Sequence, residues 1–149
     1  MDYNAPDLSK NPPRGPRVRL GGYVILPRML DKCRAQIAGT NGEYHYSCPL
    51  DKRWFDFAGI DPLELKGEVE SGFGDAEILQ WITSNSTTKP DFLAIEAWSR
   101  YQEQRVPGDS DSREFFNELH NGAAQHREDI FTWFDLLDLD DFVTFGGKA

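Results

Sequence analysis

Residues 26–39, Leu-Pro-Arg-Met-Leu-Asp-Lys-Cys-Arg-Ala-Gln-Ile-Ala-Gly, carry the pattern that decides the fold class. Their apolar side chains recur at helical spacing, at Leu26, Met29, Leu30, Cys33 and Ile37. The proline at the second position suits the first turn of a helix, and the closing glycine suits the residue just past its end. The stretch therefore predicts an amphipathic helix that ends near residue 38.

Six further segments show the same kind of signal, and we expect helices over about 49–58, 61–71, 75–82, 88–101, 111–121 and 130–137. Asp61-Pro62-Leu63-Glu64 and Asp111-Ser112-Arg113-Glu114 both have capping-box spacing, which marks a helix start. The side chains expected to face the core include Ile78, Leu79, Ile82, Ala94, Trp98, Tyr101, Phe115, Phe116 and Leu119. Because Trp54-Phe55-Asp56 and Trp133-Phe134-Asp135 resemble each other, we expect both ring pairs to be buried, and Asp61 and Asp140 to lie near helix N-termini.

Strand signals are thin by comparison. Only residues 44–46 and 142–145 combine β-branched or aromatic side chains in short runs, and these two pieces could pair at an edge. The predicted fold class is therefore all-α, with about seven short helices, and one short β pairing of these two pieces stays open as an addition.

The first 17 residues contain Pro6, Pro12, Pro13 and Pro16, which remove backbone donors and fix φ. This stretch predicts an extended, proline-rich arm that packs along its own domain. Residues 13–16 also have the spacing of a polyproline ligand, a weaker alternative. The length of 149 residues suits a single domain spanning 1–149.

Composition narrows the class of protein. A net charge of -9 argues against a nucleic-acid partner, because such binding depends on a basic surface. No apolar run approaches the roughly 20 residues that span a bilayer, so no membrane association is predicted. The two cysteines and the absence of a secretion signal at the start favour a soluble, cytoplasmic protein.

Charge is sorted along the chain. Seven of the sixteen Lys and Arg residues lie between positions 10 and 34, beside one acid, Asp31. Residues 128–141 hold six acids and no base. Since opposite local charges attract, we expect the basic arm to fold back over the acidic C-terminal segment.

The basic segment also supplies the candidate anion site. Helix N-termini offer free amide donors, and glycine lets a ligand approach the backbone closely, so phosphate or carboxylate could dock at the start of the first helix. The candidate residues are Arg17, Arg19, Gly21, Gly22, Arg28 and His45. The competing interpretation, that these arginines pair with the chain's own acids, is favoured.

No catalytic residue, metal or cofactor is predicted. His45 and Cys48, with Cys33 or Glu43, make an incomplete zinc ligand set, and activation of Cys48 by His45 lacks a third orienting group. The acids at 135–141 lack the order of a calcium-binding loop.

Several motifs occur together in a familiar order. They are Asn11-Pro12-Pro13-Arg14, residues 17–23 (RVRLGGY), Leu30-Asp31-Lys32, Gly42-Glu43-Tyr44, residues 48–51 (CPLD), residues 133–138 (WFDLLD) and residues 145–149 (FGGKA). Through them the chain resembles, over nearly its whole length, domain of unknown function family 5069. The resemblance implies a small, single-domain, bacterial cytoplasmic protein, and it implies no activity, cofactor or catalytic residue.

These observations lead to two hypotheses. The first is a non-catalytic binding or protein-interaction module, which predicts exposed Trp or Phe side chains in an apolar patch. The alternative is a small-anion binding protein or enzyme, in which the arginine cluster near the first helix would bind a phosphate or carboxylate metabolite. The expected partner is accordingly an unknown protein or a small anionic ligand.

Overall fold

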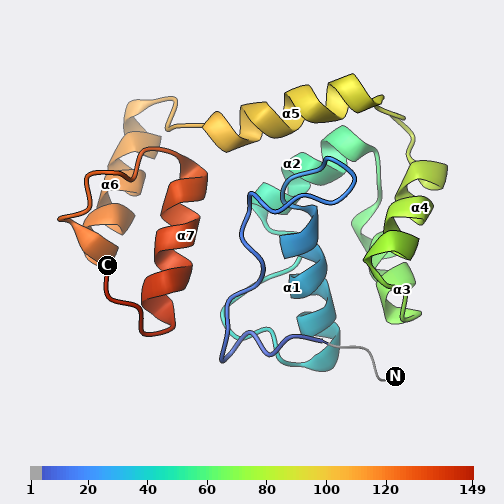
Figure 1. Cartoon of the computed structure of the whole chain (residues 1–149), viewed down its shortest axis with the longest axis horizontal. Coiled ribbons are helices and arrows are strands. Elements are labelled where there is room, and N and C mark those ends of the chain that lie inside the picture. Colours follow the sequence, from blue (N-terminus) through green and yellow to red (C-terminus); the bar gives the residue numbers. More distant parts are fainter. Residues whose placement is uncertain (1–4) are drawn as a thin grey trace.

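The computed structural model describes residues 5–149, which fold into seven α-helices with no strand among them (Figure 1). The predicted all-α class is confirmed. The helices are α1 (Leu26–Ala38), α2 (Pro49–Ala58), α3 (Pro62–Glu70), α4 (Asp75–Asn85), α5 (Phe92–Gln104), α6 (Ser110–Ala124) and α7 (Trp133–Thr144). None of these helices is long and apolar enough to cross a membrane.

Helix α1 lies at the centre of the larger group of helices, with α2 and α3 packed against it (Figure 1). Helix α5 crosses the top of the molecule and leads to a second group, the pair α6 and α7. Each group has its own apolar cluster: Met29, Trp54 and Ile78 lie in the larger one, and Phe116 and Leu139 in the smaller one. The two groups meet along α7.

Local capping explains where several helices begin and end. The Asp61 side chain accepts hydrogen bonds from the backbone N–H groups of Leu63 and Glu64, as the capping-box spacing predicted. Gly39 and Gly59 close α1 and α2 in the left-handed conformation that glycine adopts without strain. Helix α6 differs from the prediction: it starts after Asp109, whose side chain caps it, and continues past Gly122.

The predicted β pairing is wrong. Residues 44–46 lie in the loop between α1 and α2, and residues 142–144 form the last turn of α7. Leu139 and Val143 continue the helical spacing, and both pack into the smaller cluster, so burial favours a helix over a strand here. Asp140 also departs from its prediction: it lies far along α7, because Thr132 caps that helix at its start.

The described part of the N-terminal arm contacts the larger group of helices through Leu8 and Pro6. Leu8 is fully buried, and its N–H donates to the Thr40 carbonyl at 2.8 Å. The Thr40 hydroxyl donates in turn to the Pro6 carbonyl at 2.9 Å. The predicted arm also includes residues 1–4, which lie outside the described residues.

Gly59 closes α2 where the α4–α5 loop passes, and its replacement by alanine should be more destabilising than the same change at Gly39. Both glycines have positive φ, +65° and +76°. A Cβ at Gly59 would lie 2.7 Å from the Thr88 nitrogen, whereas nothing lies within 4 Å of one at Gly39. We expect Gly39→Ala to cost about 1 kcal/mol from backbone conformation alone, and Gly59→Ala about 1–3 kcal/mol more from the clash.

Urea denaturation of the two variants measures this difference directly. Equal losses at the two positions would show that the Thr88 backbone moves freely, and would contradict the close packing of this loop on α2.

Candidate functional site

The basic and acidic ends of the chain meet on α7, as their charges predicted. Arg17 forms ion pairs with Asp135 and with Asp138, the latter at 2.6 Å. Arg28 lies deeper: its guanidinium donates to Asp141 at 2.7 Å, and both side chains are less than 10% exposed. Exposed pairs contribute only about 0.2–1 kcal/mol each, so Arg17 orients the arm more than it stabilises the fold.

The arginines of the predicted anion site do not converge on one cavity. Arg17 and Arg28 both contact α7, but Arg19 pairs with Glu96 and Glu103 on α5, the latter at 2.8 Å. Every one of the three guanidinium groups is thus engaged by a carboxylate of the chain itself. A phosphate or carboxylate ligand at these arginines would have to displace those carboxylates.

The other candidate residues of that site lie elsewhere. Gly21 and Gly22 both have positive φ, and they pack against apolar side chains: a Cβ on Gly21 would meet Leu79, and one on Gly22 would meet Ile95. His45 is exposed in the loop before α2. Among residues 5–149, no group of three or more His, Cys, Asp or Glu side chains has the geometry to hold a metal ion.

A different site appears where α2 faces α6 and α7. A cavity of about 460 Å³, which we call the α2/α7 cavity, opens there to solvent. Its apolar walls come from three segments distant in sequence, α2, α6 and α7, and their side chains include Pro49, Leu50, Phe115, Leu119, Trp133 and Leu136. Volumes of roughly 300–1,000 Å³ are typical of small-molecule sites.

Two side chains that were expected in the core line this cavity instead. Phe115 and Leu119 have the helical spacing of core residues, yet they are 55% and 45% exposed. Trp133 is half-buried, with its ring edge-on to Phe116 at 5.2 Å. These side chains keep apolar surface open to the cavity instead of covering one another.

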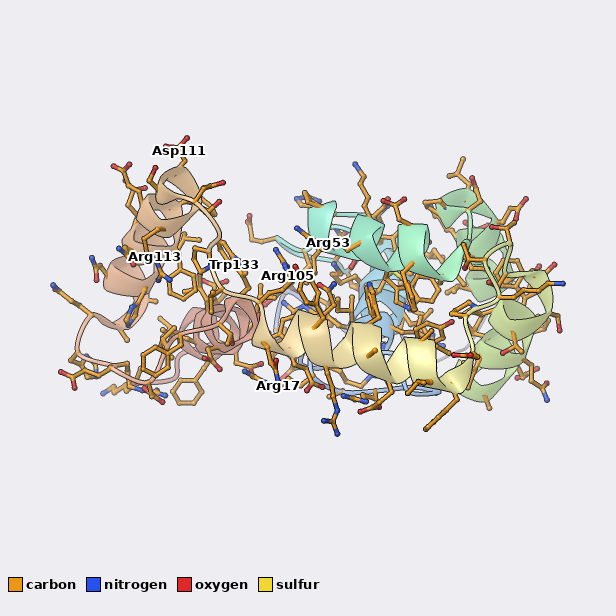
Figure 2. All side chains as sticks on the ribbon, turned by 90° about the horizontal axis from the view of Figure 1, so that it is seen from above. Arg17, Arg53, Arg105, Asp111, Arg113 and Trp133 are labelled. Carbon is orange, nitrogen blue, oxygen red and sulfur yellow. The ribbon has the colours of Figure 1, made fainter. Side chains whose placement is uncertain are left out.

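Two arginines line the same cavity, Arg53 of α2 and Arg105 at the end of α5. In Figure 2, Arg105 lies between Trp133 and Arg53, whereas Arg17 lies on the other side of α5. The Arg105 carbonyl accepts the Trp133 N–H at 3.0 Å, so the backbone of Arg105 is fixed against the start of α7.

Neither of these arginines has an acidic partner in the part of the chain that the structure describes. Seven of the ten arginines form ion pairs, but no carboxylate of residues 5–149 lies within 4 Å of a guanidinium nitrogen of Arg53 or Arg105. Burial, followed by the charge of Arg53, lowers the pKa of Arg105. The cavity therefore holds two arginines without a close carboxylate, in a protein of net charge -9.

Among the described residues, Asp140 is the one acid that lines the cavity. Burial and the neighbouring charge of Asp141 raise its pKa. Sequence reasoning missed Arg53 and Arg105 because they lie far apart in the sequence, and only the fold brings them to one cavity. No signal in the sequence indicates that these two arginines remain unpaired together.

A buried ion pair adjoins the cavity wall. The Lys32 ammonium lies 2.8 Å from Asp51 Oδ2, and both side chains are at most 4% exposed. The same ammonium donates to the sulfur of Cys48, a cavity residue, at 3.2 Å. Cys33 is also buried, and burial raises the pKa of its thiol to about 12.

A second hollow, of about 330 Å³, lies between α7 and the loop before it. Asp129, Asp135 and Asp138 line it, but Arg127 pairs with Asp129 and Arg17 with the other two. Its charged groups thus already form ion pairs within the chain, unlike the arginines of the α2/α7 cavity.

Comparison with known proteins identifies the family without an activity. The family described as "Domain of unknown function (DUF5069)" matches residues 10–143. A search of the curated proteins finds no match. Since the matched segment includes all seven helices except the last residue of α7, the chain belongs to this DUF5069 family.

Proposed function

We propose that the protein is a non-catalytic binding module and that the α2/α7 cavity is its ligand site. The observation that carries this proposal is the exposure of Phe115, Leu119 and half-buried Trp133 around one concave space. Complete burial of a large apolar side chain contributes about 1.5–3 kcal/mol. These partly exposed side chains forgo a part of that stabilisation, and a ligand in the cavity would restore it. Apolar walls with a few polar groups are what small ligands occupy in general.

The position of the cavity also supports a binding role. Its walls combine the N-terminus of α2 with the second helical group, α6 and α7. A binding module is expected to expose Trp or Phe side chains in an apolar patch; at this cavity Phe115 is 55% exposed and Trp133 is half-buried.

Binding of a neutral apolar dye tests this proposal. N-phenyl-1-naphthylamine fluoresces strongly when it leaves water, and we expect its emission to rise on mixing with the protein. Leu119→Trp places a larger side chain at the cavity wall on α6 and should weaken dye binding by about tenfold or more, the equivalent of about 1.4 kcal/mol.

Leu93→Trp is the matched control, because Leu93 is 75% exposed on α5 and does not line the cavity. We expect this variant to bind the dye as the parent protein does. An absent rise in emission, or equal weakening by the two substitutions, would refute the cavity as a ligand site.

A further inference from the structure

Whether the ligand of the α2/α7 cavity is neutral or charged depends on Arg53 and Arg105. Both arginines line a cavity that is otherwise largely apolar, and neither has a carboxylate within 4 Å among residues 5–149. Arg105 is half-buried, and Arg53 is exposed. This arrangement places positive charge in the lining of a largely apolar cavity.

Leaving these two arginines unpaired is unfavourable. Like charges repel, and a partly desolvated guanidinium loses hydration that a hydrogen bond to an anion would replace. The lowered pKa of Arg105 has these same two causes, burial and the charge of Arg53. An anion between the two groups would relieve both.

We infer that the cavity binds a small amphipathic carboxylate, with its head group at Arg53 and Arg105 and its apolar tail along Leu119 and Trp133. This inference rests on the proposed function, since it names the class of ligand for that same cavity. Guanidinium groups match carboxylates with paired, charge-assisted hydrogen bonds, whereas the apolar walls offer a tail only van der Waals contact and release from water.

The charges at the cavity also select among anions. Two arginines and Asp140 leave a net charge of about +1 when Asp140 is ionised, which one carboxylate neutralises. A dianionic phosphate would face Asp140 without a further cation to balance it. The balance of charges in the cavity thus favours a ligand with a single negative charge.

Three ligands with the same eight-carbon tail separate these possibilities: octanoate, 1-octanol and octylammonium. Each is titrated below its micelle concentration against the protein with N-phenyl-1-naphthylamine bound, and displacement of the dye gives the affinity. We expect octanoate to bind at least about tenfold more tightly than 1-octanol, since hydrogen bonds to charged groups contribute about 1.5–3 kcal/mol. Octylammonium should bind most weakly, because it is repelled by both arginines.

Variants then assign the effect to the two arginines. Octanoate should bind Arg53→Gln/Arg105→Gln no more tightly than 1-octanol does. Arg113→Gln is the matched control: Arg113 also lacks an ion pair among the described residues, but it covers the Phe116 ring at 5.3 Å and does not line the cavity. Octanoate should retain its full preference in that variant.

The outcomes distinguish the inference from the function on which it rests. If the dye binds but octanoate and 1-octanol displace it equally, the carboxylate inference is overturned and the binding role stands. Preference for octanoate that survives Arg53→Gln/Arg105→Gln overturns the assignment of the head group. If the dye does not bind at all, the cavity is not a ligand site and both proposals fail.

Discussion

Replacing Trp54 by alanine is expected to lower the free energy of unfolding by about 3–5 kcal/mol, the range for deletion of a large buried ring. Trp54 lies in α2 and has no exposed surface. Its indole packs edge-on against Tyr23 at 5.5 Å and Phe55 at 5.4 Å, and it joins the segment before α1 to α2. The loss combines the transfer of the ring to water with the cavity that it leaves.

Urea denaturation followed by circular dichroism measures this loss. Leu63→Ala is the control, because Leu63 is 77% exposed on α3 and its truncation should change stability by no more than about 0.5 kcal/mol. If Trp54→Ala does not fold, Trp54→Phe removes less volume and still reports on the site. A loss below about 1 kcal/mol for Trp54→Ala would show that α2 is not anchored through this ring.

Much of the helical architecture could be predicted because its signals are local. Asp61 caps α3 through its own side chain, and Gly39 and Gly59 end their helices through backbone conformation. Such features depend on a few neighbouring residues, so their spacing in the sequence is sufficient. The spacing of Met29, Cys33 and their neighbours likewise identified the buried face of α1.

The wrong predictions concern residues whose burial or secondary structure is determined by long-range packing. Tyr101 was expected in the core but is 63% exposed, and the neighbouring Gln102 is buried instead. Residues 142–144 have strand-like side chains, yet Val143 packs into the smaller cluster as part of α7. Propensity is a weak signal for short segments, and tertiary contacts override it.

Of the sites described above, one could be predicted from the sequence and the other could not. The contact between the basic and acidic ends could be predicted, because the net charge of a segment does not depend on its local structure. The α2/α7 cavity could not, because it depends on the gap that remains after α6 packs on α7. Phe115 and Leu119 look like core residues in the sequence, and only the fold shows them open to solvent.

Replacing Asp51 by alanine is the second change with a large expected effect, a loss of about 3–5 kcal/mol in the free energy of unfolding. Asp51 is completely buried, and its Oδ2 accepts hydrogen bonds from the Lys32 ammonium at 2.8 Å and from the Ser47 backbone at 2.9 Å. Without the carboxylate, a charged ammonium that is only 4% exposed has no counter-ion. The unpaired charge, more than the lost attraction, causes the destabilisation.

The double variant Lys32→Met/Asp51→Leu tests this reason, because it removes both charges and keeps apolar volume. We expect it to regain most of the stability that Asp51→Ala loses, since apolar replacements of buried ion pairs are often neutral or stabilising. Lys32→Met alone should be strongly destabilising, because it leaves the Asp51 carboxylate buried without its cation. If the double variant is as unstable as either single one, packing and not charge dominates at this position, and the ion pair is not what holds α1 against the start of α2.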